Sequence, residues 1–358
     1  MSKLHIVATQ VDSARRLRLG YGLNAAASLL LLGTIAAQYL PLGLTNWRPT
    51  LYAYVLWAIA LCASQVIVRG EQGKRVLFVL PAALFVASLA LFPLVFGLTI
   101  AFSDWNLANP DGRQFNGLAN IKQMFGDTYF WRSMGNMGWY VLAILAEYIV
   151  AFGLALMLNA EIRGRKFFRV AFLLPLMLSP VAVSWMIGKS MLENRFGPVA
   201  RLLRSLGVDN PTFFGDPAIA KLTIMLMDAW TYIPFMMIML LAGLQAIPKD
   251  LNEAADVDGA RGVRRFFEIT FPIMARVSIT AILIRVIFKL KLADIIITVT
   301  GGGPGGATDS VTSFIYREYR DRSNVGYGTM LAMFYLVVIV IGMTGLIKFT
   351  NRWKGADA

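Results

Sequence analysis

Residues 249–272, KDLNEAADVDGARGVRRFFEITFP, form the longest polar run between apolar segments that carries a specific pattern. Asp250 is a candidate N-cap, and Glu253, three residues later, has the spacing of a capping box. The pattern predicts a short helix over 251–258, about 12 Å long. Gly259 is expected to end it in a left-handed turn. A short helix with slim alanines on one side has the shape to fit a groove on another protein.

The composition around this stretch is that of a membrane protein. Hydrophobic residues make up 57% of the 358 and charged residues 15%, where soluble domains hold about 25% charged residues; the mean hydropathy is +0.60. The net charge of +13 comes from basic residues at the ends of apolar runs, which indicates a membrane and not nucleic acid. The single cysteine, Cys62, and the single histidine, His5, exclude an intrachain disulfide, a Cys/His metal site and a histidine-based triad.

Eight apolar segments are long enough to cross a bilayer, which takes roughly 20 residues per helix. The chain is therefore predicted to be an all-α integral membrane protein with about eight transmembrane helices. The fifth segment contains Pro175 and Pro180 and is expected to be kinked or broken. The segments are about 20–42, 51–68, 76–102, 138–159, 170–192, 219–244, 273–299 and 327–349.

Eight spans put both chain ends on the same side, and the charge distribution predicts which side. With the ends inside, the inner segments hold roughly 19 of the 34 lysines and arginines, against about ten in the outer loops. Both termini and the 249–272 stretch are therefore expected in the cytoplasm. The basic group Arg163, Arg165, Lys166 and Arg169 is expected there too, and the loops 106–113 and 301–312 outside.

The 249–272 stretch resembles the EAA motif of ABC importer permeases in both order and spacing. The chain looks like a member of the carbohydrate-uptake branch and is similar to its F-type sugar permease subunits. One departure is Phe271, where the family usually has leucine before the proline. The matching residues are Glu253, Ala254, Ala255, Asp258, Gly259, Ala260, Phe266, Ile269 and Pro272.

The resemblance implies a six-helix permease core over 76–358, with a cytoplasmic coupling loop at 245–272. The tail and two-helix hairpin at 1–75 would then be an N-terminal addition. It also implies a bacterial inner membrane and four partner chains: a second permease subunit, two ATPase subunits and a substrate-binding protein. The coupling residues Glu253 to Ala255 and Asp258 to Ala260 would enter a cleft on an ATPase.

The chain has no GxxxxGK[ST] sequence, so no P-loop is expected in it. ATP and Mg²⁺ are accordingly expected on the ATPase partner, with no cofactor and no catalytic site in this chain. Its glycine run, Thr300–Pro304 with Gly305 and Gly306, predicts a flexible turn that ends a helix. The TGGGP sequence also resembles the loop of F-type subunits, which implies contact with the binding protein; a plain connecting loop is the alternative.

Polar and aromatic side chains inside the apolar spans are candidates for a sugar route. Sugar sites combine flat aromatic faces with polar partners, and polar residues within a membrane are functional candidates by default. Asp228, Thr231 and Tyr232 share one helix face. Packing between helices is the alternative for each candidate. The candidates are Asp228, Trp230, Thr231, Tyr232, Ser184, Trp185, Glu147 and Lys289.

The seventh span carries an unusual number of charges for a helix in lipid: Arg285, Lys289, Lys291 and Asp294. An unpaired charge at the bilayer centre costs about 2.5–3.5 kcal/mol or more. Lys291 and Asp294 are three residues apart and are predicted to pair with each other. For Arg285 and Lys289, the favoured hypothesis is pairing with Asp228 or Glu147. The alternative is that they bind an anionic sugar.

Three classes of function remain to be compared. The leading interpretation is the permease subunit of an ATP-driven importer for a sugar, polyol or glycoside. An autonomous secondary transporter of a small polar solute is the alternative, which the EAA-like stretch disfavours. A membrane-embedded enzyme would need a nucleophile with a base or a metal site, and the sequence offers only scattered carboxylates.

Overall fold

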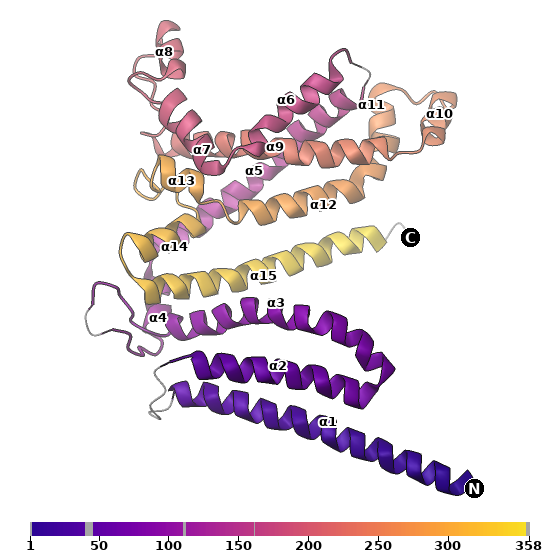
Figure 1. Cartoon of the computed structure of the whole chain (residues 1–358). Helices are drawn as coiled ribbons and strands as arrows, with labels where there is room; N and C mark the ends of the chain where they lie inside the picture. Colours follow the sequence, from indigo (N-terminus) through magenta and orange to yellow (C-terminus); the bar gives the residue numbers. More distant parts are fainter. Residues whose placement is uncertain (1, 40–45, 110–111, 161, 356–358) are drawn as a thin grey trace. The chain divides into compact units, whose positions relative to one another are not determined.

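The computed structural model describes residues 2–39, 46–109, 112–160 and 162–355. Within these ranges the chain is almost entirely helical, with two isolated backbone bridges and no strand (Figure 1). The chain divides into two compact units, residues 1–96 and 97–358. This division falls inside a helix, whereas the sequence places the boundary of the N-terminal addition after residue 75, and that boundary stays a prediction.

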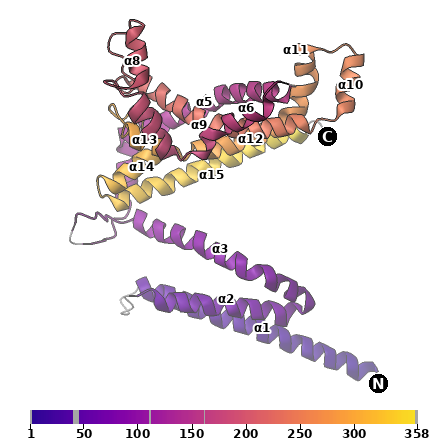
Figure 2. The ribbon, with the colours of Figure 1, turned by 45° about the horizontal axis from the view of Figure 1, so that its top comes forward.

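The first unit is built from an antiparallel helix pair and the greater part of a third helix. The first two helices lie side by side (Figure 2), and the Trp57 indole donates to Ser28 Oγ across them at 3.0 Å. Tyr54 donates to the Leu84 carbonyl at 2.6 Å and ties the third helix to the second. The helices are α1 (Ser2–Tyr39), α2 (Arg48–Arg69) and α3 (Glu71–Ala101).

The second unit contains the remaining helices. The loop after α3 includes one short helix, α4 (Ala119–Gly126). The elements that follow are α5 (Thr128–Asn159), α6 (Arg165–Met177), α7 (Pro180–Val183), the π-helix η1 (Ser184–Met191), α8 (Pro198–Ser205), α9 (Pro217–Gln245), α10 (Lys249–Val257), α11 (Gly262–Arg265), the π-helix η2 (Phe266–Thr270), α12 (Phe271–Lys289), α13 (Asp294–Val299), α14 (Val311–Arg320) and α15 (Val325–Gly355).

The two ends of the second unit carry different elements. α10 and α11 lie at one end, together with the start of α6, and α8, α13 and α14 lie at the other (Figures 1 and 2). The loop after α3 belongs to the second of these ends, because Leu107 donates its backbone N–H to the Ser323 carbonyl at 2.9 Å. Segments that the charge distribution assigns to opposite sides of a membrane thus lie at opposite ends of this unit.

Six of the described helices are long and apolar enough to cross a membrane, or seven if one bent pair counts as a single span. The predicted number of about eight is therefore approximate. The bent pair is the fifth predicted span: α6 and the α7–η1 segment meet at 97°. Pro175 lies near the end of α6, and Ser179 caps α7 by accepting from the Ala182 N–H at 3.2 Å. The kink predicted from the prolines is confirmed.

The seventh predicted span, 273–299, is not one helix. α12 ends at Lys289 and α13 begins at Asp294. The break frees backbone carbonyls that need donors inside a membrane. Hydroxyl groups supply them, because Thr312 and Tyr335 each donate to the Leu290 carbonyl at 3.0 Å, and Ser310 donates to that of Leu292. These donors lie on later helices or just before them, so reading the span alone did not reveal the break.

Orientation gives the first testable prediction. In a Cys62→Ala background, an impermeant thiol reagent added outside intact cells should label Ala108→Cys. It should label Arg163→Cys only after the membrane is opened, because the basic group is expected to face the cytoplasm. Both positions are exposed in the structure, so unequal labelling reports the side of the membrane. Labelling at position 163 from outside would contradict the predicted topology.

Candidate functional site

Four charged side chains from three helices meet inside the second unit. α5 supplies Glu147, α9 supplies Asp228, and α12 supplies Arg285 and Lys289, which lie one turn apart. All four are buried, at 4% exposure or less. We refer to these four residues as the charge cluster.

Each cation of the charge cluster contacts both anions. Arg285 Nε donates to Glu147 Oε2 at 2.8 Å, and Lys289 Nζ donates to Glu147 Oε1 at 2.7 Å. Arg285 Nη2 and Lys289 Nζ both donate to Asp228 Oδ2. Two positive and two negative charges therefore form a closed, neutral group. This confirms the hypothesis that Arg285 and Lys289 pair with carboxylates of the fourth and sixth predicted spans.

The guanidinium of Arg285 also packs over an aromatic ring. Its central carbon lies 4.5 Å from the centre of the Tyr232 ring. Tyr232 lies one turn along α9 from Asp228, and both residues contact Arg285, so they share one helix face as predicted. The Nη1 atom of Arg285 is buried and has no hydrogen-bond partner among the described residues. Tyr232 itself is half-buried. The Tyr232 ring thus covers the charge cluster at Arg285, whose Nη1 group makes no hydrogen bond within the described chain.

The other candidates for the sugar route lie in different environments. Thr231 is buried and donates to the Met227 carbonyl of its own helix at 3.0 Å. Ser184 is buried and donates to the Pro180 carbonyl at 2.7 Å. Trp230 and Trp185 are exposed, at 40% and 60%. The structure gathers Glu147, Asp228, Tyr232 and Lys289 around Arg285 but does not bring these two tryptophans to them.

The predicted pair of Lys291 and Asp294 is wrong. No ion pair joins them in the described chain, and both side chains are exposed. The prediction assumed a continuous helix, in which residues three apart lie on the same face. The break between α12 and α13 falls between the two residues and removes that geometry.

The EAA-like stretch forms the expected short helix. α10 covers Lys249–Val257 and ends in a left-handed turn at Gly259, with φ of +70°. The Ala260 N–H donates to the Ala255 carbonyl at 2.9 Å. This is the hydrogen bond of a Schellman turn that spans six residues. Ala255 and Ala260 are buried, whereas Glu253, Ala254 and Asp258 are exposed. The turn thus packs Ala255 and Ala260 inward and presents the acidic Glu253 and Asp258 outward.

The start of α10 differs from the prediction. Pro248 occupies the N-cap position, and no side chain caps the helix. Asp250 and Glu253 therefore do not form a capping box. Proline is tolerated here because the N–H it lacks would have no partner within the helix. Asp250 instead lies in the first turn, where its negative charge interacts favourably with the helix dipole.

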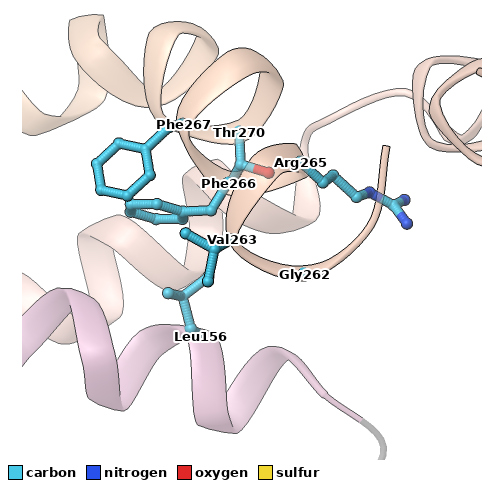
Figure 3. A pocket seen from close by; sticks show the side chains of 7 residues that line it. All are labelled: Leu156, Gly262, Val263, Arg265, Phe266, Phe267 and Thr270. Carbon is cyan, nitrogen blue, oxygen red and sulfur yellow. The ribbon is translucent and has the colours of Figure 1, made fainter. Parts of the chain in front are cut away.

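An open apolar groove of about 530 Å³ lies next to this turn, lined mainly by η2, α11 and Leu156 of α5. Figure 3 shows Val263 and the Phe266 and Phe267 rings gathered toward Leu156, with Arg265 pointing away. Phe266 also packs edge-on against Phe152 of α5, with ring centres 5.4 Å apart. The segment after α10 is therefore in direct contact with a membrane helix.

The glycine loop after α13 ends that helix as predicted but is held firmly by side chains. Arg132, Asn136 and Tyr140 of α5 donate to the carbonyls of Gly305, Gly306 and Thr308 at 2.9, 3.2 and 2.8 Å. The loop is thus packed onto α5 at three points. The sequence interpretation missed this, since regularly spaced polar residues at the start of α5 were the only signal.

A buried carboxylate supports the same loop. Asp309 is buried, accepts from Ser313 Oγ at 3.0 Å and pairs with Arg317. A Cβ atom on Gly302, where φ is +88°, would lie 2.2 Å from Asp309 Oδ1, so only glycine fits. Burial raises the pKa of the Asp309 carboxyl, although Arg317 and Ser313 act in the opposite direction.

Comparison with known proteins places these features in a family. The profile of the family "Binding-protein-dependent transport system inner membrane component" matches residues 149–352, from α5 to α15. The sulfoquinovosyl glycerol transport system permease protein SmoG of Agrobacterium fabrum is 33% identical over 265 residues, 74% of this chain and 86% of that protein. The trehalose/maltose transport system permease protein MalF of Thermococcus litoralis is 35% identical over 229 residues, 64% and 77% of the two chains.

The fold also matches that of solved transporters. The crystal structure of a bacterial alginate ABC transporter in complex with an alginate pentasaccharide-bound periplasmic protein contains a similar chain, with a TM-score of 0.68 and 22% identity. The match covers 80% of this chain and 98% of that one. At this level of identity the likeness establishes the fold.

The charge cluster gives the second prediction. Lys289→Gln leaves three charges with a net charge of −1 and should destabilise the protein by about 3–5 kcal/mol, the range for breaking a buried pair. Adding Asp228→Asn restores neutrality and should recover at least half of that loss. Unfolding of the purified protein in detergent measures both. Lys291→Gln, which removes an exposed lysine two positions away, is the control and should change little. Additive losses in the double variant would contradict the neutral cluster.

Proposed function

Because the chain belongs to the family of binding-protein-dependent transport system inner membrane components, we propose that it is the permease subunit of an ATP-binding-cassette importer for a sugar, polyol or glycoside. The observation that carries this proposal is α10. At one end of the second unit it exposes Glu253, Ala254 and Asp258, the EAA-like residues available to a partner.

The carbohydrate class is supported by the relatives. Their names refer to a sulfoquinovosyl glycerol and to trehalose and maltose, and a trehalose transport system permease protein, SugA of Mycobacterium tuberculosis, is 27% identical over 290 residues. These cargoes share sugar rings with many hydroxyl groups. We propose that this chain carries a solute of the same general class, delivered by a separate binding protein.

The partners follow from what the chain offers at its two ends. We propose that a second permease subunit completes the route and that two ATPase subunits dock on the α10 end, with ATP and Mg²⁺ bound by them. The exposed Glu253 and Asp258 would contact basic groups of an ATPase, and the neighbouring groove of Val263, Phe266 and Phe267 offers apolar contact area. The binding protein would dock at the opposite end, where the glycine loop lies. In this arrangement both termini are cytoplasmic.

Movement of α10 has a direct path into the membrane helices. The Phe266 ring packs against Phe152 of α5 and, at 5.8 Å, against Phe271 at the start of α12. Farther along, the charge cluster joins α5 and α12 to α9. We propose that closure of the ATPase subunits moves α5, α9 and α12 together. Phe266 contacts α5 and α12 near α10, and the charge cluster joins all three helices farther along.

The route for the solute is proposed to pass beside the charge cluster. Tyr232 supplies a half-buried aromatic face there, and Arg285 Nη1 is a donor without a hydrogen-bond partner in the described chain. Thr231, Trp230, Ser184 and Trp185 remain candidates on the neighbouring parts of α9 and the bent span. The cluster adds no net charge to this route, and a sugar hydroxyl can both donate and accept hydrogen bonds beside it without leaving an unpaired charge.

One experiment tests the proposed function as a whole. The tagged chain is purified from mild detergent, and its co-purifying proteins are identified. An ATPase and a second permease in stoichiometric amounts are expected. Uptake driven by an ion gradient in vesicles that contain this chain alone would instead favour a secondary transporter. The cognate binding protein, screened by thermal shift against sugars, polyols and glycosides, then identifies the cargo.

Coupling gives the third prediction. Gly259→Pro forbids the positive φ of the Schellman turn, and Glu253→Lys reverses a charge offered to the ATPase. Both variants should reach the membrane at normal levels and lose at least about tenfold in uptake and in ATP hydrolysis stimulated by the binding protein. A charge pair enclosed in an interface is worth about 2 kcal/mol or more, and about 1.4 kcal/mol is already a factor of ten; Gly259→Pro displaces the whole turn that presents Glu253 and Asp258.

The matched control for this prediction is Asp250→Lys. It reverses an exposed charge on the same helix outside the EAA-like residues, and uptake should remain within about fivefold of the starting protein, because exposed charge pairs contribute at most about 1 kcal/mol. Normal uptake in both Gly259→Pro and Glu253→Lys would refute the assigned role of α10, as would an equal loss in the control.

A further inference from the structure

The connection between α10 and α11 contains two glycines in the left-handed region. Gly259 and Gly262 have φ of +70° and +56°, and the backbone of Arg261 between them is extended. α10 itself has few contacts with the other helices of the described chain and lies at one end of the second unit (Figures 1 and 2). Because glycine has the least restricted backbone, a short helix on such a connection can pivot unless a side chain holds it.

One ion pair crosses this connection. Arg265 Nη1 donates to Asp256 Oδ1 at 3.1 Å, and Figure 3 shows Arg265 extending away from the apolar side chains of the groove. Asp256 lies in the last turn of α10, where a carboxylate is unfavourable beside the negative end of the helix dipole. The pair with Arg265 offsets this cost and ties α10 to α11.

Arg265 belongs to the same helical run as the cations of the charge cluster. α11, η2 and α12 follow one another without a gap over residues 262–289, so this run extends from the connection to Arg285. The residue after Arg265 is Phe266, which packs against Phe152 of α5. A force on α10 that passes through the ion pair thus reaches α12 along one helical run and α5 through one side chain.

We propose that Asp256 and Arg265 are positioning residues whose ion pair braces α10, so that movement of α10 becomes movement of α5 and α12. This inference rests on the proposed function, in which closure of the ATPase subunits moves α10. With the ion pair intact, α10 and α11 move as one body. Without it, α10 pivots at Gly259 and Gly262, and ATP is hydrolysed while the membrane helices move less.

Loss of the ion pair should therefore lower the uptake per ATP hydrolysed and leave hydrolysis itself nearly unchanged. Asp256→Asn and Arg265→Gln each remove one charge. Each should lower this ratio about fivefold, which corresponds to about 1 kcal/mol, the upper value for an exposed pair. Uptake and hydrolysis stimulated by the binding protein are measured in the same proteoliposomes of the assembled transporter. A parallel loss of hydrolysis and uptake would contradict the proposal.

A neighbouring ion pair provides the matched control. Arg264 Nε donates to Glu268 Oε2 at 3.0 Å, and this pair stays within the helical run and does not cross the connection. Arg264→Gln should keep uptake per ATP within about twofold of the starting protein, the range of a helical pair four residues apart. The reversed pair, Asp256→Arg/Arg265→Asp, should return the ratio to the same range. An equal loss in Arg264→Gln, or no recovery in the reversed pair, would overturn the proposal.

A distance measurement on the full chain tests the ion pair independently of transport. Spin labels are attached at Asp250→Cys in α10 and Val150→Cys in α5, both exposed positions, in the Cys62→Ala background. The distribution of distances between the labels should be broader in Asp256→Asn than in the starting protein or in Arg264→Gln, because α10 is then able to pivot. Equal widths in all three would refute the proposal. Unequal widths in a transporter that shows neither uptake nor stimulated hydrolysis would instead contradict the proposed function alone.

Discussion

Charge neutrality inside the membrane region is the constraint on which the second unit depends. An isolated charge in a low-dielectric environment is very costly, and a buried pair is stable only with good geometry. The charge cluster meets this condition because each cation of α12 reaches both carboxylates, one on α5 and one on α9. Three helices that differ widely in sequence position are thus held in one arrangement, and the alternative positions of α12 would expose unpaired charge.

The ends of the unit differ in how they use backbone groups. At the α10 end, backbone groups pair with one another in the Schellman turn after α10, and the acidic side chains stay exposed. At the other end, side chains of α5 hold the glycine loop, and Thr312 at the start of α14 donates to a carbonyl of the broken span. One end is therefore built to present a surface, and the other to fix irregular backbone. This division fits the proposed docking of the ATPase subunits at one end and of the binding protein at the other.

The features that sequence reasoning predicted correctly depend on few residues close in the chain or on elementary charge balance. Gly259 ends α10 because only glycine adopts the required φ easily, and Pro175 and Pro180 break their span for equally local reasons. Arg285 and Lys289 required partners, and only two carboxylates stood within nearby apolar spans. The break after Lys289 escaped prediction because its hydroxyl donors, Thr312 and Tyr335, lie more than twenty residues away. Asp250 failed as a cap because Pro248 started the helix earlier.

The order of the charged helices along the chain has a consequence for biogenesis. Glu147 and Asp228 precede Arg285 by 138 and 57 residues, so the ribosome delivers both anions to the membrane before either cation exists. Each unpaired carboxylate weakens the insertion of its helix. α5 and α9 must therefore be retained by their own apolar residues, or by the insertion machinery, until α12 arrives. Synthesis of α12 is then the step at which the charge cluster becomes neutral, so that the helices can leave that machinery.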